Sequence, residues 1–195
     1  MPQTLSNVDK QILDSIAPLP EPVARPALVM LVGLPGTGKS FFTRALVERY
    51  PLAVVETDAV RKLLFGNPTY QPDEHYRVHK TCYRIIAELL RRGIGVAFDA
   101  TNLQERAREQ VYHIAEQWGA RLLVVKLEAP PEVVKERLER RAANRDDRDR
   151  SDATWDVYQA MASSVERIRR NHYTVDTSQD IGPVVEKVVR ELRRR

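Results

Sequence analysis

The sequence contains a single cysteine, Cys82, among its 195 residues. An intramolecular disulfide framework and a zinc site built from several cysteines are therefore excluded. No apolar run approaches the roughly 20 residues that a helix needs to span a bilayer, and the polar N-terminus does not resemble a signal peptide. We therefore expect a cytoplasmic protein that has no membrane partner.

A strong charge of one sign is also lacking. The 31 Lys and Arg residues against 27 Asp and Glu residues give a formal net charge of +4. This mild excess permits an anionic substrate but does not require a nucleic acid. An apolar fraction of 43% with 30% charged residues is typical of a soluble globular protein. The length fits one domain with a proper core, or one domain with a short appendage.

The most specific motif is a complete phosphate-binding loop of the pattern G-x-x-x-x-G-K-[ST]. It consists of Gly33, Leu34, Pro35, Gly36, Thr37, Gly38, Lys39 and Ser40. The glycines permit a tight turn that points successive N–H groups at an anion. The lysine reaches the β- and γ-phosphates, and the serine offers a hydroxyl to Mg²⁺. We expect ATP and Mg²⁺ to bind here, with Thr43 as a further nucleotide-binding residue.

The segments on either side of this loop provide the context that a true match requires. The apolar, β-rich run 27–32 precedes the loop, and 41–47 suits a helix whose N-terminus would face the phosphates. The alternative is a glycine-rich strand-to-helix turn that binds nothing. Such a turn would not need a lysine and a serine in those two places.

Apolar runs alternate with helix-period segments along the chain. We predict strands over 27–32, 52–57, 95–99, 121–127 and 172–176, and helices over 4–16, 73–92, 104–118, 131–144, 152–170 and 181–193. This alternation indicates right-handed βαβ crossovers and an α/β fold, in which a doubly wound parallel sheet has helices on both faces. Binding sites in such sheets lie at the carboxyl ends of the strands.

A proline-rich stretch separates the first predicted helix from the first core strand. Four prolines lie between residues 18 and 26, which is typical of an extended linker. We therefore expect two parts in the chain: an N-terminal helix with its linker over 1–26, and a P-loop domain over 27–195.

Two aspartates lie at predicted strand ends, Asp58 after the second strand and Asp99 at the end of the third. Either residue could simply cap the next helix or turn. Phosphoryl transfer, however, needs one carboxylate that orients or deprotonates the attacking hydroxyl and another that holds Mg²⁺. We assign the first role to Asp58 and the metal role to Asp99 with Ser40. The spacing alone does not fix this division of roles.

An arginine-rich stretch runs from Glu136 to Arg150 and holds six arginines and five acids. A solvated helix end with ion pairs accounts for most of these arginines. Arg137 and Arg141 share one helical face, however, and lid arginines in kinases stabilise charge on the transferring phosphoryl group. We expect the segment 145–150 to hinge over the bound nucleotide and exclude water.

The order of these motifs resembles the polynucleotide-kinase-type P-loop kinases, which include AAA-type predicted ATP-binding kinases and, more distantly, zeta-toxin-like kinases. The likeness covers residues 27–178 and rests on the phosphate loop, the Asp58-x-x-Arg61 spacing, the segment 99–103 and the arginine-rich helix. It implies a five-stranded core in the order 2-3-1-4-5 with an arginine-rich lid.

The resemblance also implies roles for individual residues. Asp58 matches the position that activates the acceptor hydroxyl, and Arg61 matches the one that holds the acceptor or an adjacent phosphate. Arg137 and Arg141 match lid arginines that contact the nucleotide phosphates, and Asn102 lies in the strand-end motif near the acceptor pocket. The implied catalytic set is therefore Lys39, Asp58, Arg61, Arg137 and Arg141.

The acceptor is less well defined than the donor. The sequence has no obvious aromatic-plus-basic track of the kind that binds single-stranded nucleic acids. A polynucleotide 5′-hydroxyl is our first hypothesis, and the alternative is a small molecule such as a sugar, nucleotide sugar or antibiotic. A third possibility is an ATPase or switch without an acceptor, against which Asp58 and Arg61 argue.

His75 and His79 stand four residues apart on a predicted helix, a spacing compatible with a metal pair. No glutamate lies between them in the zincin arrangement, and no third ligand is evident. We interpret them as surface or pocket-wall residues that line the acceptor side.

Overall fold

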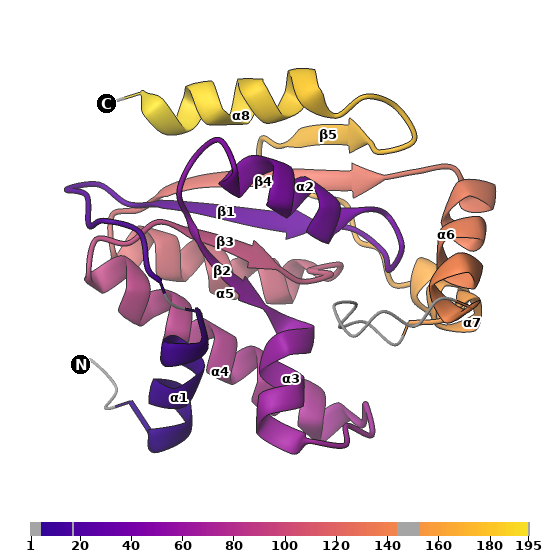
Figure 1. Ribbon diagram of the computed structural model, residues 1–195, viewed down its shortest axis with the longest axis horizontal. Helices are drawn as coiled ribbons and strands as arrows, with labels where there is room; N and C mark the ends of the chain where they lie inside the picture. Colours follow the sequence, from indigo (N-terminus) through magenta and orange to yellow (C-terminus); the bar gives the residue numbers. More distant parts are fainter. Residues whose placement is uncertain (1–4, 17, 144–152, 195) are drawn as a thin grey trace.

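A computed structural model describes residues 5–16, 18–143 and 153–194 (Figure 1). Within these ranges five strands form one sheet in the order β2-β3-β1-β4-β5, and every neighbouring pair is parallel. The strands are β1 (Ala27–Val32), β2 (Ala53–Glu56), β3 (Val96–Asp99), β4 (Arg121–Glu128) and β5 (Tyr173–Asp176). The predicted fold class and strand order are therefore confirmed.

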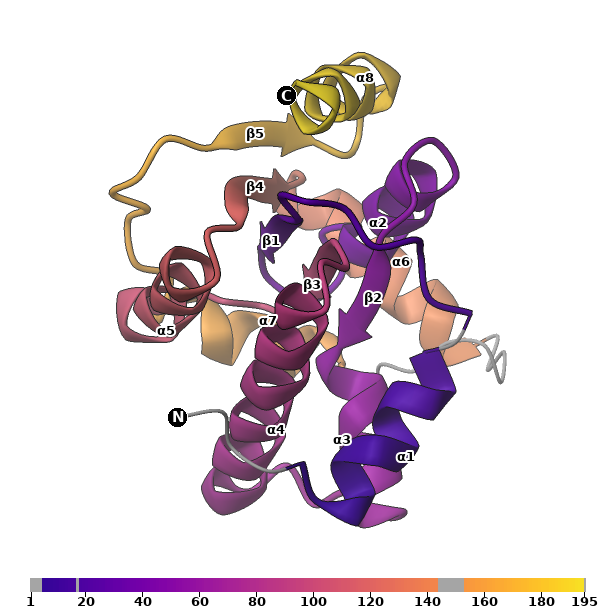
Figure 2. The same cartoon turned by 90° about the vertical axis from the view of Figure 1, so that its left-hand side faces the viewer.

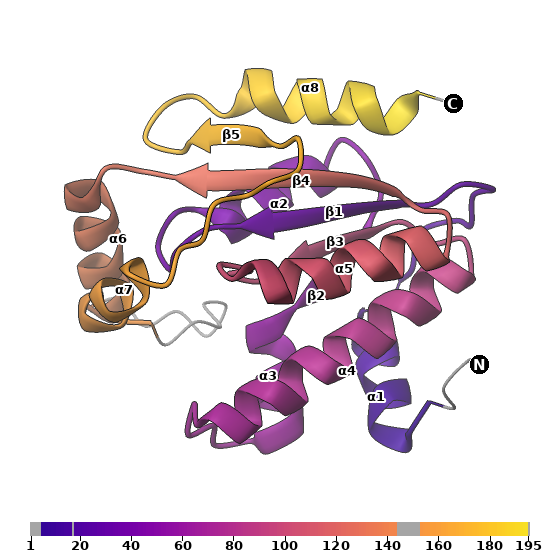
Figure 3. The ribbon, with the colours of Figure 1, turned by 180° about the vertical axis from the view of Figure 1, so that it is seen from behind.

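Helices cover both faces of the sheet. They are α1 (Asn7–Ile16), α2 (Lys39–Val47), α3 (Thr57–Phe65), α4 (Pro72–Arg91), α5 (Glu105–Gln117), α6 (Pro131–Ala143), α7 (Trp155–Ala162) and α8 (Gly182–Arg193). Helices α2 and α8 lie on one face, and α4 and α5 lie on the other (Figures 1 and 3). Helices α6 and α7 lie beyond the carboxyl ends of β1 and β4. In the described part of the chain, no helix has the length and apolarity for a membrane crossing.

The central strand β1 is buried along its whole length because it has a neighbour on each side and helices on both faces. Successive side chains of a strand point to opposite faces. Leu28 and Met30 accordingly belong to the apolar cluster under α4 and α5, whereas Val29 and Leu31 belong to the cluster under α2 and α8. The carboxyl end of β1 therefore lies in the middle of the row of carboxyl strand ends, and the phosphate loop begins there.

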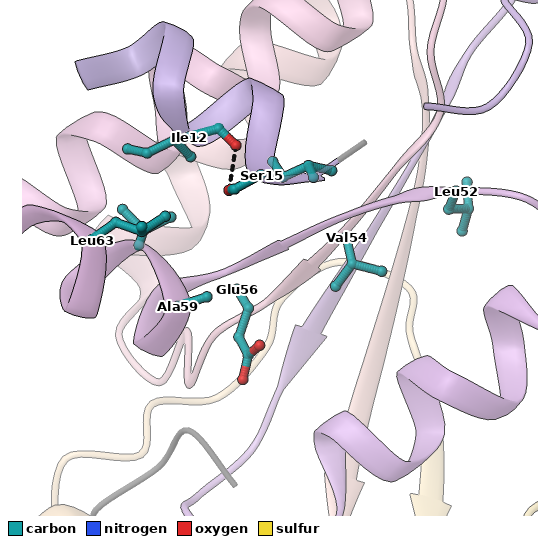
Figure 4. Close-up of a pocket in the computed structure, with 9 residues that line it drawn as sticks. Ile12, Ser15, Leu52, Val54, Glu56, Ala59 and Leu63 are labelled. Carbon is teal, nitrogen blue, oxygen red and sulfur yellow. Dashed lines mark hydrogen bonds between the residues drawn. The ribbon is translucent and has the colours of Figure 1, made fainter. Parts of the chain in front are cut away.

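Helix α1 lies beside α3 and α4 and next to the edge strand β2 (Figure 2). Ile12 and Leu13 are buried in the same apolar cluster as α4 and β3. The buried carboxylate of Asp9 accepts two hydrogen bonds from Arg84 on α4, one from Nη2 at 2.8 Å and one from Nε at 3.1 Å. A pocket remains between α1, β2 and α3, with Ile12, Val54 and Leu63 in its wall (Figure 4).

Two local predictions need correction. The helix predicted over 152–170 is wrong beyond Ala162, where α7 ends, and residue 152 lies outside the described residues. The chain after α7 is held by α5 instead, because Arg108 donates hydrogen bonds to the carbonyls of Glu166 and Arg167. The second strand ends at Glu56 and not at Thr57, so Asp58 lies in the first turn of α3.

Candidate functional site

The phosphate loop connects β1 to α2 at the carboxyl edge of the sheet. Gly36 and Gly38 have φ angles of 77° and 85°, which a residue with a side chain rarely adopts. A Cβ at Gly36 would lie 2.8 Å from Val134 Cγ1 of α6, so the loop is packed closely under that helix. Lys39 Nζ donates a hydrogen bond to the carbonyl of Leu34 across the loop at 2.9 Å.

This loop fits the phosphates of a nucleotide. Helix α2 begins at Lys39, and its N-cap Gly38 supplies no side-chain capping bond. The first N–H groups of a helix have no partners within the helix, and together with the helix dipole they form a site for an anion. Thr43 is buried in the next turn, where its hydroxyl donates to the carbonyl of Lys39 at 3.0 Å.

Four charged side chains gather around Lys39. Burial lowers the pKa of its ammonium group, whereas the nearby carboxylates of Asp99, Asp58 and Glu56 raise the pKa, and Arg141 lowers it. These residues come from the ends of β2 and β3, the start of α3 and the last turn of α6. The fold therefore brings together Lys39, Asp58, Asp99 and Arg141, which were predicted as site residues from four separate segments.

Asp99 ends β3 directly beside α2. Burial raises the pKa of its carboxyl, while Lys39 and a hydrogen bond with Ser40 lower the pKa. The carboxylate of Asp99 and the exposed hydroxyl of Ser40 are oxygen donors of the kind that Mg²⁺ prefers. The two predicted metal-side residues therefore lie together and fit a magnesium ion beside the phosphate loop.

Arg61 lies one turn after Asp58 in α3 and points into the turn between α3 and α4. Its side chain is buried, with a residue exposure of 4%. Its Nη1 lies 3.6 Å from Glu74 Oε2 and its Nη2 lies 3.4 Å from His75 Nδ1. The guanidinium carbon lies 4.8 Å from the centre of the Tyr70 ring. Arg61 is therefore fixed against the turn and the first turn of α4 by these contacts.

His75 of α4 contacts Arg61, and His79 lies one turn further along the same helix. Arg61 can only donate, so Nδ1 of His75 is the acceptor and this imidazole is neutral. The rings of His75 and His79 are 4.4 Å apart. Burial, then His75, then Arg61 lower the pKa of His79 to about 3. Among the described residues no group of three metal-ligating side chains forms.

Arg137 connects α6 to the phosphate loop through Thr177, which follows β5. Arg137 Nη1 donates to Thr177 Oγ1 at 2.8 Å, and Nη2 donates to the Thr177 carbonyl at 2.7 Å. Thr177 Oγ1 in turn donates to the carbonyl of Thr37 at 2.9 Å. A Cβ at Gly38 would lie only 3.1 Å from Thr177 Oγ1, so this contact leaves no space for a side chain in the loop.

Asn102 is buried at the end of the segment that follows β3. It has a φ of 46°, and its Nδ2 donates to the Leu31 carbonyl of β1 at 2.7 Å. The neighbouring Thr101 carbonyl accepts from the Gly33 N–H at 3.0 Å. Asn102 therefore joins the strand-end segment to the first residues of the phosphate loop.

Sequence reasoning missed Thr177 and Arg108 as parts of this framework. Thr177 directly follows the last strand, so the rule that sites lie at carboxyl strand ends points to it. Arg108 has the spacing of the buried face of α5, three and four residues before Val111 and Tyr112, but its residue type argues against burial because arginine is almost never fully buried unless it is paired. It is fully buried, and its Nη1 donates to the Asn102 carbonyl at 2.9 Å. The segment 145–150, predicted as a lid, lies outside the described residues.

The fold and its phosphate loop define a P-loop protein. Residues 28–168, more than half of the chain, match the family described as AAA domain. The chain belongs to this AAA domain family.

Several solved structures share the fold. Kti12 from Chaetomium thermophilum in complex with ADP-AlF3 has a TM-score of 0.68 and 17% identity, over 85% of this chain and 96% of that chain. The Mycobacterium tuberculosis APS kinase CysC, in complex with AMPPNP and APS, has a TM-score of 0.64 and 18% identity, over 89% of this chain and 100% of that chain. A chain of the Pnkp1/Rnl/Hen1 RNA repair complex has a TM-score of 0.60 and 24% identity, over 72% of this chain and 44% of that chain.

Proposed function

We propose that this protein is an ATP-dependent phosphotransferase that moves the γ-phosphate of ATP to a hydroxyl, and that the acceptor is a polynucleotide 5′-hydroxyl. One observation carries the proposal. Asp58, Asp99 and Arg141 all lie within range of the charge of Lys39 in the phosphate loop. A nucleotide-binding switch needs the loop and a metal-side carboxylate, but it has no need of a second carboxylate such as Asp58.

The two aspartates take different roles in this proposal. Asp99 lies against Ser40 on the loop side, where the pair would hold Mg²⁺. The metal ion, when bound, neutralises charge that builds up on the phosphate oxygens. Asp58 lies in the first turn of α3, the helix that also carries Arg61, and we place the acceptor hydroxyl on this side of the site. Asp58 is therefore the residue that accepts the proton of the acceptor hydroxyl.

Transfer then proceeds by in-line displacement. The acceptor oxygen forms a bond to the γ-phosphorus as its proton passes to Asp58, and the bond from that phosphorus to the leaving oxygen of ADP breaks. Lys39 and Arg141 are placed to stabilise the negative charge on the phosphoryl and leaving oxygens. Arg137 donates a hydrogen bond to Thr177 and so holds α6 against one side of the proposed nucleotide site.

The likeness to a chain of an RNA repair complex favours the polynucleotide acceptor. The likeness to an APS kinase favours a small hydroxylated molecule as the second candidate, since that structure is a complex with AMPPNP and APS. Asp58 would deprotonate the hydroxyl of either acceptor, so its proposed role is the same for both.

An acceptor panel tests the proposal. The protein is incubated with radiolabelled ATP and Mg²⁺ together with 5′-hydroxyl DNA, 5′-hydroxyl RNA or hydroxylated metabolites. We expect label on the 5′ ends of oligonucleotides and binding that weakens steeply with salt, because phosphate contacts release counterions. Label on a neutral metabolite alone would favour the small-molecule kinase. ATP hydrolysis with no labelled acceptor would contradict both.

Replacement of Thr177 by valine tests the connection between α6 and the loop. The variant removes the hydroxyl that accepts from Arg137 and donates to Thr37. Each lost hydrogen bond costs about 1 kcal/mol, so we expect ATP affinity to fall about 5- to 30-fold. Isothermal titration with ATP measures this change. Thr177→Ser keeps the hydroxyl and is expected to bind ATP like the wild type. An ATP affinity of Thr177→Val equal to that of the wild type would contradict the proposed role of Thr177 in connecting α6 to the loop.

A further inference from the structure

The turn between α3 and α4 holds Tyr70 in an unusual backbone conformation. Its φ of 57° lies in the left-handed region, which bulky side chains rarely adopt. In the described part of the chain, the only other non-glycine residue with a positive φ is Asn102, at the candidate site itself. Strain of this kind gathers at functional sites when the surrounding structure enforces it.

Glu74 enforces the conformation. Its buried carboxylate accepts hydrogen bonds from the Tyr70 N–H at 2.9 Å and the Thr69 N–H at 2.9 Å, and a third from the Thr69 hydroxyl at 2.7 Å. The same carboxylate lies 3.6 Å from Arg61. One side chain therefore fixes both the backbone of the turn and the cation beneath the Tyr70 ring.

The ring of Tyr70 lies above the guanidinium of Arg61. The distance from the guanidinium carbon to the ring centre is 4.8 Å. Arg61 follows Asp58 by three residues in α3, so the two side chains lie on one helix face. Arg61 is almost fully buried, whereas Tyr70 keeps 48% of its surface exposed. The aromatic ring is thus held on a buried cation that lies one helical turn after Asp58, and about half of the Tyr70 surface is exposed.

We propose that Tyr70 is the stacking platform for the base of the terminal nucleotide of the acceptor strand. The proposal rests on the polynucleotide acceptor and deepens it. Stacking of a base on an aromatic side chain tolerates any base because every base has a π-face. A ring fixed in advance loses little conformational freedom when a base stacks on it. No contiguous aromatic-plus-basic run in the sequence indicates this platform, because Arg61 and Tyr70 meet only through the turn.

The test compares two single-stranded oligonucleotides that differ only in whether the 5′-terminal residue carries a base or is abasic. Both have a free 5′-hydroxyl, and kcat/KM for phosphate transfer is measured for each. We expect the wild type to prefer the base-bearing strand about 5- to 150-fold, the range of one base stacked on one aromatic ring. Tyr70→Leu should abolish this preference, while Tyr70→Phe should keep it.

Tyr76→Leu is the matched control. Tyr76 is 65% exposed on α4, and Lys80 Nζ lies 5.6 Å from its ring centre, so it has an exposed ring and a cation but no contact with Arg61. We expect this variant to retain the wild-type preference. The ratio between two substrates within one preparation does not depend on the fraction of folded protein, so partial unfolding of a variant leaves the result readable.

Three outcomes would overturn the inference. A preference that survives in Tyr70→Leu, or equal use of both strands by the wild type, refutes the platform and leaves the kinase proposal intact. Failure of the wild type to phosphorylate any oligonucleotide refutes the polynucleotide acceptor and the platform together. ATP affinity, measured in each variant without acceptor, should stay within about twofold of wild type, because Tyr70 lies on the acceptor side.

Discussion

Replacement of Lys39 by alanine is expected to lower phosphate transfer by about a thousandfold or more, while the protein stays folded. Lys39 is the cation at the centre of the site, and the nearby carboxylates of Asp99, Asp58 and Glu56 lose their common counter-charge when it is removed. Transition-state charge on the phosphoryl oxygens then lacks its nearest stabilising group, and fixed charges of this kind contribute several kcal/mol to phosphoryl transfer. Single-turnover kinetics with radiolabelled ATP measure the loss.

The fold should tolerate this change because Lys39 makes one hydrogen bond, to the Leu34 carbonyl, that its alanine variant lacks. We expect the free energy of unfolding to change by about 1 kcal/mol, measured by denaturant titration. Lys187→Ala is the control: Lys187 lies on α8 with its Nζ 5.4 Å from the Tyr173 ring centre, away from the loop. Full activity of the Lys39 variant would refute the assignment of the site.

Replacement of Asp58 by alanine should remove phosphate transfer but leave ATP binding nearly unchanged. Asp58 lies at the start of α3 and is proposed to take the acceptor proton, and a positioned general base contributes about 10²- to 10⁴-fold to the rate. We expect a fall in kcat of that size. The dissociation constant for ATP, measured by titration calorimetry, should stay within about threefold of wild type, because the metal-side carboxylate Asp99 remains in place.

Glu56→Gln is the matched control for Asp58. Glu56 stands two residues earlier and also raises the pKa of Lys39, so it shares the electrostatic environment without the proposed proton transfer. We expect its kcat to fall much less than that of Asp58→Ala. An equal loss of kcat in both variants would indicate that the local negative charge contributes to the rate and that Asp58 does not act as a base. A collapse of ATP affinity in Asp58→Ala with normal residual chemistry would place Asp58 on the nucleotide side.

Much of the fold could be predicted because its signals are local. The phosphate loop is a contiguous motif, and the strand cores are short apolar runs between turn residues, so the strands are assigned within a residue or two of their ends. The exception is the helix predicted over 152–170. Its sequence after Ala162 suits a helix, but Arg108 of α5 binds the carbonyls of Glu166 and Arg167 and holds that stretch in a different conformation.

The candidate site was predicted as a set of residues but not as an arrangement. Its members come from four segments of sequence, and strand order alone brings Asp58 and Asp99 to the loop, because β3 lies between β1 and β2. The contacts of Arg61 and Arg137 had no sequence signal. Arg61 meets Glu74 and Tyr70 across a turn, and Arg137 of α6, the helix after β4, meets Thr177 at the end of the neighbouring strand β5.

The sequence by itself determined that this protein has a phosphate loop on a doubly wound parallel sheet, with two aspartates and two arginines suited to phosphoryl transfer. Residue type, spacing and periodicity suffice for this because they act within a few residues of one another. Only the tertiary structure decided which of these side chains meet. The contacts of Thr177 with Arg137 and with Thr37 join residues that are 40 and 140 positions apart, and such pairs form only when the sheet has brought its carboxyl ends together.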